Sequence, residues 1–149
     1  MDKFLVRKAK KEDSKKIWEI RNHSLSRKNF NNPDEILWED HKAWFDDKYF
    51  NWKDNYCFVL VDKSNKVIGY CRFDFETEEK FYIVSIAVNP NNYNQGLGSK
   101  LLSESIKRIE DGRSILAEVH KNNISSLKLF EKNNFKIYKE NNEKYYLKI

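Results

Sequence analysis

The chain has few of the residues that mark disulfide-rich, metal-binding or repetitive proteins: its 149 residues include 2 cysteines, 4 glycines and 2 prolines. Cys57 and Cys71 belong to no Cys-x-x-Cys motif and to no Cys/His cluster, which argues against a metal site and a redox pair. Both lie in apolar, strand-like runs. We therefore expect two buried free thiols and no bound metal.

Long hydrophobic runs are absent too. No segment approaches the roughly 20 apolar residues of a membrane-spanning helix. Residues 1–16 are polar and charged, unlike a signal peptide with its apolar centre. We expect a cytoplasmic protein with no membrane partner.

The sequence also lacks a long block of one charge sign, although its formal net charge is +5. The 28 basic residues are interspersed with 23 acidic ones, as on a solvated mixed-charge surface. This pattern argues against a nucleic-acid partner. The positive excess suits a small polyanionic ligand, because the summed field raises the local concentration of such a ligand.

The sequence does contain enough apolar material for one core, since hydrophobic residues make up 40% and aromatic residues 15% of the chain. The length is that of a single domain, residues 1–149, with no linker and no internal repeat. Hydrophobic periodicity and turn residues predict the order β-α-α-β-β-β-α-β-α-β-β. The fold class is therefore α/β or α+β, a mixed sheet with helices packed on its faces.

Two of the predicted helices have identifiable ends. The second begins at Pro33 and Asp34, and its apolar face holds Leu37, His41, Trp44 and Phe45. The third runs from about Gly98 to Glu110 and is stopped by the glycine at position 112.

The most informative segment joins a buried strand to the third helix through a loop with two closely spaced glycines, Gly96 and Gly98. Without Cβ atoms, these glycines allow successive N–H groups to point toward one ligand, and the helix start adds its positive dipole end. The third glycine of a dinucleotide fingerprint and the Gly-Lys-Ser/Thr of a triphosphate loop are both missing. The segment thus suits a pyrophosphate in a different setting, although Gly-x-Gly pairs also occur in ordinary turns.

Residues 86–99 resemble the acetyl-coenzyme A signature of the GNAT superfamily of N-acetyltransferases, a strand ending in Val-x-Pro followed by Arg/Gln-x-x-Gly-x-Gly/Ala. Tyr93 stands where the family usually has Arg or Gln, which leaves the backbone amides intact. Residues 118–135 resemble the family's next strand, its Asn-capped helix and the Lys-x-Gly-Phe ending. Asn134 replaces the usual glycine, and Asn is the next best residue in a left-handed conformation.

The resemblance implies a mixed, mostly antiparallel GNAT sheet with helices on both faces, and acetyl-CoA as the acetyl donor. It also implies which residues contact that donor. The main chain of Ile86, Ala87 and Val88 would pair with the pantetheine arm, the pyrophosphate would bind Asn94, Gln95, Gly96, Leu97, Gly98 and Ser99, and the thioester end would lie beside Asn123 and Phe130.

Acetyl transfer to an amine needs a base, an oxyanion donor and an acid. His41 and Asp74 are the candidate catalytic residues, since histidine ordinarily titrates near neutrality and Asp74, with Glu76, lies at the end of a strand expected to border the acceptor cleft. Each has a plain alternative, a core histidine for His41 and an ion pair with Arg72 or a lysine for Asp74. The family's usual oxyanion donor is the N–H near Val88. Its usual acid is a Tyr at the position of Phe130, which has no proton to donate.

The first half resembles, more weakly, GNAT members that acetylate amino groups of nucleotide-linked sugars in surface-glycan biosynthesis. The matching features are Arg21-Asn22, Arg27, Glu39-Asp40-His41 with Trp44-Phe45, and residues 69–74. Arg21, Arg27 and Arg72 suit a diphosphate, because the guanidinium fork binds phosphate oxygens bidentately. Rings that suit stacking on a base or sugar are Trp38, Trp44 and Trp52.

Other acceptors and roles remain open at this point. GNAT members that acetylate protein N-termini, including ribosomal ones, share the Arg-Asn and His-x-x-Trp features, so a peptide is the alternative acceptor. A module that binds acetyl-CoA or RNA without catalysis is the alternative from another class. Arginines also cover helix ends and tryptophans fill cores. The oligomeric state is left open, a homodimer included.

Overall fold

The computed structural model describes residues 3–23, 34–52, 54–93, 95–109 and 112–149. Within these ranges a seven-stranded sheet has the order β1-β2-β3-β4-β5-β7-β6. Only the β4–β5 pair is parallel. The strands are β1 (Phe4–Lys8), β2 (Tyr56–Asp62), β3 (Val67–Glu76), β4 (Phe81–Val88), β5 (Ile115–His120), β6 (Lys136–Glu140) and β7 (Lys144–Lys148). The mixed, mostly antiparallel sheet and the predicted order of helices and strands are confirmed.

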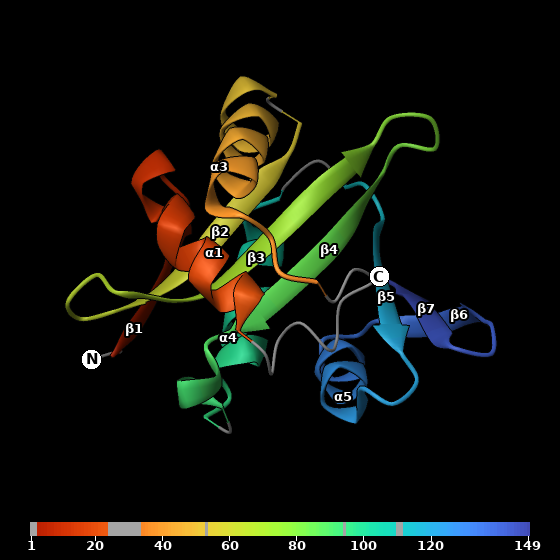
Figure 1. Ribbon diagram of the computed structural model, residues 1–149. Helices are drawn as coiled ribbons and strands as arrows, with labels where there is room; N and C mark the ends of the chain where they lie inside the picture. The colour runs from red at the N-terminus through yellow and green to blue at the C-terminus, as the bar shows by residue number, and fades with distance from the viewer. Residues whose placement is uncertain (1–2, 24–33, 53, 94, 110–111) are drawn as a thin grey trace.

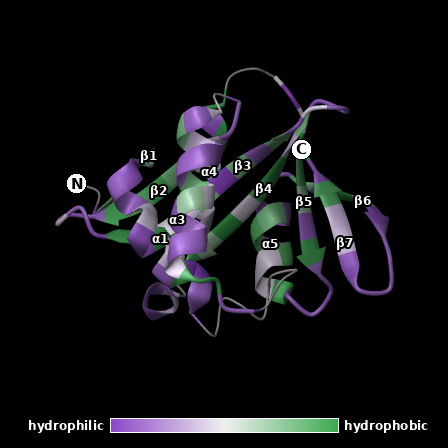
Figure 2. Cartoon of the chain, turned by 45° about the horizontal axis from the view of Figure 1, so that its top comes forward, coloured by the Kyte–Doolittle hydropathy of each residue, from purple (hydrophilic) through white to green (hydrophobic). Residues whose placement is uncertain are grey.

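Helices cover both faces of this sheet (Figure 1). Helices α1 (Ser14–Asn22) and α3 (Trp38–Asp46) lie on one face, and α4 (Leu97–Lys107) and α5 (Ile124–Lys132) lie on the other. The central strands are buried on both sides, so β2 reads as the continuous apolar run Tyr-Cys-Phe-Val-Leu-Val rather than as an alternating pattern. Figure 2 shows this apolar centre in green, with hydrophilic residues on the outer sides of the helices and in the loops.

Two hydrophobic clusters result from the two-sided covering. Alternate residues of β3 point to opposite faces, so that Tyr70 belongs to the cluster under α1 and α3, whereas Cys71 and Phe73 belong to the cluster with α4 and α5. Cys57 and Cys71 are both buried and free, as expected. Arg72 and Asp74 follow Tyr70 by two and four residues along β3, so the same alternation places them on the α1/α3 face.

Helix α3 begins at Trp38, not at residues 33–34 as predicted from the sequence. Leu37 is the residue before the helix, with an extended backbone and a side chain that is 67% exposed, so it does not share the buried face. The cause is local competition for the backbone of Ile36. Its N–H donates to Asn22 Oδ1 at 2.9 Å, and its carbonyl accepts from Asn22 Nδ2 at 2.7 Å and Trp18 Nε1 at 2.6 Å. Position 33 lies outside the described residues.

Helix ends elsewhere follow the chemistry of the sequence. Helix α4 ends at Lys107, before the predicted end at residue 110, which lies outside the described ranges. Helix α5 is capped at its start by Asn123, whose Oδ1 accepts from Ser126 N at 3.2 Å. At its other end Asn134 takes the left-handed conformation with φ 71°, and the N–H of Phe135 donates to Phe130 O at 3.0 Å. The exchange of glycine for asparagine is therefore accommodated as predicted.

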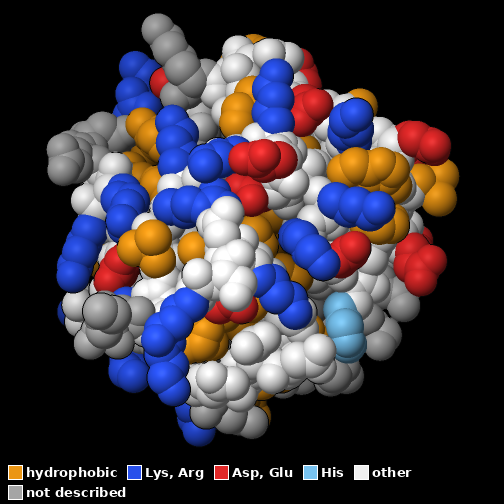
Figure 3. All heavy atoms as spheres, turned by 90° about the vertical axis from the view of Figure 1, so that its left-hand side faces the viewer, with side chains coloured by type: hydrophobic (Ala, Val, Ile, Leu, Met, Phe, Trp, Pro, Cys, Tyr) orange, Lys and Arg blue, Asp and Glu red, His pale blue; other side chains and the backbone are white. Residues whose placement is uncertain are grey.

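The surface mixes both charge signs. Figure 3 shows lysine and arginine side chains interspersed with acidic ones over one face of the molecule. None of the described helices is long and apolar enough to span a bilayer.

Candidate active site

A cleft of about 970 Å³ opens between β4 and β5. The two strands pair only at their start, where Tyr82 lies opposite Ile115 and Ile83 opposite Leu116. Beyond this point they diverge, as Figure 1 shows, and no strand of the described residues fills the gap. The walls are the free part of β4, the end of β5, the first turn of α4 and one side of α5.

The free part of β4 presents unpaired edge amides to this cleft. The N–H of Tyr82 donates toward the β5 side, to Ser114 O at 2.9 Å, whereas the N–H of Asn89 donates toward the β3 side, to Ile68 O at 2.7 Å. Because N–H groups alternate sides along a regular strand, the amides of Val84, Ile86 and Val88 also point toward the β5 side; that of Val84 belongs to the last paired position, so Ile86 and Val88 present theirs to the cleft. Ile86, Ala87 and Val88 all line the cleft.

The first turn of α4 lies at the mouth of the same cleft. Gly96 precedes the helix in the left-handed conformation, with φ 71°, and provides no side-chain cap for the first amides. The residues of this turn that line the cleft are Gly96, Leu97, Gly98 and Ser99. Gln95 is exposed and does not line it, and residue 94 lies outside the described ranges.

Gly98 lines the cleft although protein packing does not require a glycine there. A Cβ at this position would meet Leu129 at 3.7 Å and Val88 at 3.9 Å, which are ordinary van der Waals distances. A Cβ at Gly96 would meet nothing within 4 Å. A Cβ at either glycine would thus clash with none of the described residues, and the helix start can accept an anion such as a pyrophosphate at its free amides.

On the opposite wall, α5 contributes Asn123 and Phe130. The Oδ1 of Asn123 is already occupied by its cap bond to Ser126 N, at 3.2 Å. Phe130 is 4% exposed and packs edge-on against Phe135, with 5.0 Å between the ring centroids. The position at which relatives carry a phenol thus holds an apolar ring.

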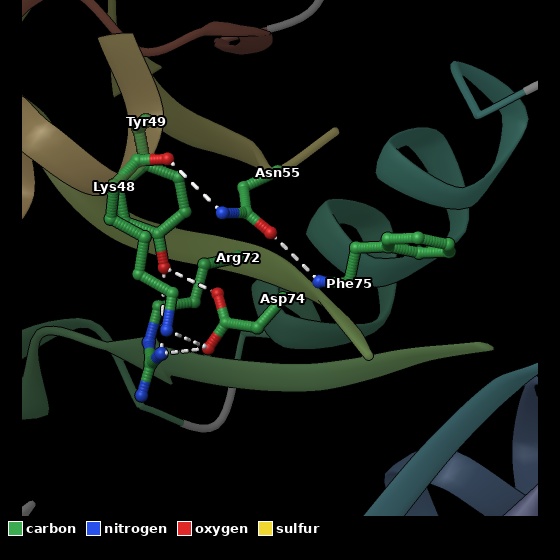
Figure 4. Close-up of polar contacts among 6 residues, drawn as sticks. All are labelled: Lys48, Tyr49, Asn55, Arg72, Asp74 and Phe75. Carbon is green, nitrogen blue, oxygen red and sulfur yellow. Dashed lines mark hydrogen bonds and ion pairs between the residues drawn. The ribbon is translucent and has the colours of Figure 1, made fainter. Parts of the chain in front are cut away.

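The α1/α3 face of the cleft carries a polar network centred on Asp74 (Figure 4). Asp74 Oδ1 accepts a hydrogen bond from the Tyr49 hydroxyl at 2.6 Å. Asp74 Oδ2 accepts from Arg72 Nη1 and lies 3.2 Å from Lys48 Nζ. Asp74 therefore pairs with Arg72 and with a lysine, as the alternative interpretation of the sequence had it.

Arg72 is the member of this network that lines the cleft. Burial acts to lower the pKa of its guanidinium, but the neighbouring Tyr49 and Asp74 raise it by more, so Arg72 stays charged. Arg21, from the end of α1, lines the cleft as well. Residue 27, the third predicted substrate arginine, lies outside the described part of the chain.

His41 lies in the core beneath α3. It is 2% exposed, stacks on Phe45 with 5.5 Å between the ring centroids, and is not among the residues that line the cleft. Burial lowers the pKa of its imidazole from 6.5 to about 4, with smaller contributions from Arg72 and Arg21. This placement favours the core interpretation of His41.

Sequence reasoning missed several residues that the structure brings to the site. Tyr49 and Lys48 come from the short helix η2 (Asp47–Asn51), and no periodicity connects them to β3. Glu118 lines the cleft from β5 together with His120, a histidine whose claim to a catalytic role was no stronger in the sequence than that of His41. Their two-residue spacing on a strand, on the side opposite the buried Ala117 and Val119, was the signal available.

Comparison with known proteins agrees with this geometry. No curated protein matches the chain significantly. Similar solved structures include the yncA protein of Salmonella typhimurium with its cofactor acetyl-CoA (22% identity, TM-score 0.84, over 99% of this chain and 94% of that one). An N-acetyltransferase from Staphylococcus aureus Mu50 has 24% identity and a TM-score of 0.80, over 99% and 98% of the two chains. A ribosomal-protein-alanine N-acetyltransferase from Brucella melitensis has 19% identity and a TM-score of 0.81, over 97% and 98%.

These likenesses establish the fold. The family is established by a sequence model described as Acetyltransferase (GNAT) family, which matches residues 15–135. That range includes the β4 edge, the α4 turn and all of α5. The chain therefore belongs to the GNAT acetyltransferase family and is an acyltransferase that uses acetyl-CoA.

Proposed function

We propose that the acceptor is a primary amine on a molecule that also carries an anionic group, with a nucleotide-linked amino sugar as the leading candidate. The observation that carries this proposal is the pair of arginines, Arg21 and Arg72, on the α1/α3 side of the cleft. The local charge supports it, because Arg72 and Lys48 together outweigh Asp74 by one positive charge. A diphosphate would find two guanidinium groups there.

The donor side follows from the edge amides and the helix start. The amides of β4 that point to the cleft would pair with the pantetheine arm, and the first turn of α4 would bind the pyrophosphate. In this arrangement the N–H of Val88 is available to a developing oxyanion. These main-chain groups need no side-chain chemistry, which explains why Tyr93 can replace the usual Arg or Gln.

Proton transfer in this proposal does not pass through the two residues first considered. The carboxylate of Asp74 is occupied by Arg72, Tyr49 and Lys48, and the core position of His41 separates it from the cleft. Solvent water takes the ammonium proton, assisted by the cleft-lining side chains Glu118 and His120. Since Phe130 has no proton to donate, the thiolate of coenzyme A leaves without a side-chain acid at that position.

The test is thiol release from acetyl-CoA with two acceptor panels, UDP-linked amino sugars and peptides with free N-termini. The proposal expects the sugars to be turned over with the higher kcat/KM. Turnover of the peptides with no response to the sugars would reject the nucleotide-linked acceptor and support the peptide. The same sugars without the nucleotide serve as the control, because they keep the amine and lose the anionic group.

A further inference from the structure

Arg72 is held by one edge only. Its Nη1 donates to Asp74 Oδ2 and lies 3.4 Å from the Tyr49 hydroxyl. Within the described residues its Nε and Nη2 make no hydrogen bond, and the side chain is 23% exposed at the cleft. An arginine in this state has one edge fixed by the protein and a second edge, Nε with Nη2, free for a planar or tetrahedral anion.

The groups that fix Arg72 are themselves anchored. Tyr49 is 8% exposed, with its ring 5.2 Å from that of Phe45, so its hydroxyl has a fixed position. The short helix that carries Tyr49 is tied to the sheet through Asn55, whose Nδ2 donates to Lys48 O at 3.1 Å and whose Oδ1 accepts from Phe75 N at 2.8 Å. Figure 4 shows this connection from the sheet through Asn55 to the helix.

A third contact places the guanidinium over the ring of Trp44. The Cζ of Arg72 lies 5.2 Å from the ring centroid of Trp44, and Lys48 Nζ lies 5.3 Å from the same ring. Trp44 is 40% exposed. Arg72 is thus restrained by hydrogen bonds with Asp74 and Tyr49 and by its contact with Trp44.

Resting on the acceptor proposed above, we propose that Tyr49 and Asp74 are positioning residues, which hold the Nη1 edge of Arg72 so that its Nε and Nη2 edge receives a phosphate or carboxylate group of the acceptor. In this assignment neither residue touches the acceptor or its amine. Asp74 serves acceptor recognition through Arg72 and not as a base. The arrangement discriminates against amines without an anionic group, because the desolvated guanidinium edge would then stay unpaired.

For Asp74→Asn, the positioning role and the change in local charge predict opposite effects on the binding of an anionic acceptor. Replacing Asp74 by Asn removes a negative charge and makes the site more positive, which by itself would improve binding of an anionic acceptor. If Asp74 positions Arg72, the same change weakens binding, because the guanidinium loses its fixed orientation. Tyr49→Phe removes the hydroxyl without a change of charge and is the cleaner of the two variants.

The experiment compares Tyr49→Phe, Asp74→Asn and Asp13→Asn by steady-state kinetics with a UDP-linked amino sugar and with the same sugar lacking the nucleotide. Asp13→Asn is the matched control, because Asp13 forms another part-buried carboxylate–arginine pair, 2.7 Å from Arg7 of β1, the strand at the far edge of the sheet. We expect the first two variants to raise KM for the UDP-linked sugar by about three- to tenfold, with kcat changed by less than about twofold. KM should be unchanged for the bare sugar and in the control.

A double-mutant cycle separates positioning from a general effect on the fold. In an Arg72→Ala background, Tyr49→Phe and Asp74→Asn should raise KM no further, since they act only through Arg72. Additive losses would overturn the proposal, and so would a lowered KM for Asp74→Asn alone.

A readout without any acceptor keeps this inference distinct from the proposed function. Rotation about the Nε–Cζ bond exchanges Nη1 with Nη2, so a guanidinium whose Nη1 is held by the protein rotates slowly about this bond and gives separate nitrogen NMR signals for Nη1 and Nη2. We expect separate Arg72 signals in the wild type and in Asp13→Asn, and merged signals in Tyr49→Phe and Asp74→Asn. Signals that stay separate in the latter two overturn the positioning role. If the signals merge but the wild type does not prefer the UDP-linked sugar, the proposed acceptor fails and the positioning of Arg72 stands.

Discussion

Ile83 of β4 and Leu116 of β5 form the last position at which these parallel strands pair. Beyond this position the amides of β4 have lost their partner strand and the cleft opens. The start of α4 lies on one face of the sheet, and Arg21 and Arg72 lie on the other. In the function proposed above, donor and acceptor would therefore meet in the gap from opposite sides.

Gly96→Ala should abolish the rise in melting temperature caused by acetyl-CoA. The wild-type shift corresponds to about 2.7 kcal/mol at a hundredfold excess of ligand over its dissociation constant. The matched control is Gly112→Ala. Gly112 has φ 72° and Gly96 has φ 71°, and a Cβ at either position meets nothing within 4 Å. Both variants should lose about 1 to 2 kcal/mol of unfolding free energy from left-handed strain. An undiminished ligand shift in a folded Gly96→Ala protein would remove this turn from the donor site.

Gly98→Ala should separate stability from binding. Alanine is favoured over glycine in a helix by up to about 1 kcal/mol, and the new Cβ has room beside Leu129. We expect a higher melting temperature without ligand and a weaker acetyl-CoA affinity, because the methyl group occupies space that faces the cleft. Titration calorimetry and thermal unfolding measure the two effects. Unchanged affinity would show that the phosphates do not approach this residue.

His41→Gln should change the pH dependence of stability rather than turnover. The pKa of His41 is about 4 in the folded protein against 6.5 for an exposed imidazole. Below pH 6.5 the unfolded chain therefore binds a proton that the folded protein does not, and stability falls as the pH drops toward 4. This loss is on the order of 3 kcal/mol over the full window.

Glutamine does not titrate, so in the variant the free energy of unfolding no longer falls at acid pH by the amount that His41 contributes. At pH 7 the variant should lose about 1 to 2 kcal/mol of unfolding free energy through poorer packing. Denaturant unfolding at pH 7 and at pH 4.5, for both proteins, measures the difference. Turnover at neutral pH should stay within about twofold of the wild type. A large loss of kcat at low pH with an unaltered stability profile would restore His41 as a base.

Phe130→Tyr should keep the fold and change kcat by less than about tenfold. The ring lines the cleft, so an added hydroxyl can reach the ligand side without a new buried polar group in the core. A hydroxyl here helps only if protonation of the thiolate limits the rate. A much larger increase in kcat would show that protonation does limit the wild-type enzyme.

The order of elements and the donor segment were predictable from sequence, because local chemistry determines both. Asn89-Pro90, the two glycines at the start of α4 and the cap residue Asn123 act on their immediate neighbours. The start of α3 was predicted four to five residues too early, since no periodicity reveals that Asn22 binds the backbone of Ile36 across 14 positions.

The acceptor side was less predictable for the same reason. Asp74 and Arg72 are two residues apart on one strand, so their pairing was foreseen as an alternative. Tyr49 is 25 residues away from Asp74 in the sequence, and only the packing of its short helix against β3 brings the hydroxyl into place. His41 was ambiguous because a single apolar face suits both a core histidine and one beside a cleft.

The burial of both cysteines has a practical consequence for assays. Burial raises the pKa of the Cys57 and Cys71 thiols well above their ordinary value, and each thiol is covered by a different hydrophobic cluster. A thiol reagent added to the native enzyme should therefore report released coenzyme A with little background from the protein. When the reagent does label the two cysteines, it does so through opening of the structure, so the slow phase of colour development records how often each side of the sheet is exposed.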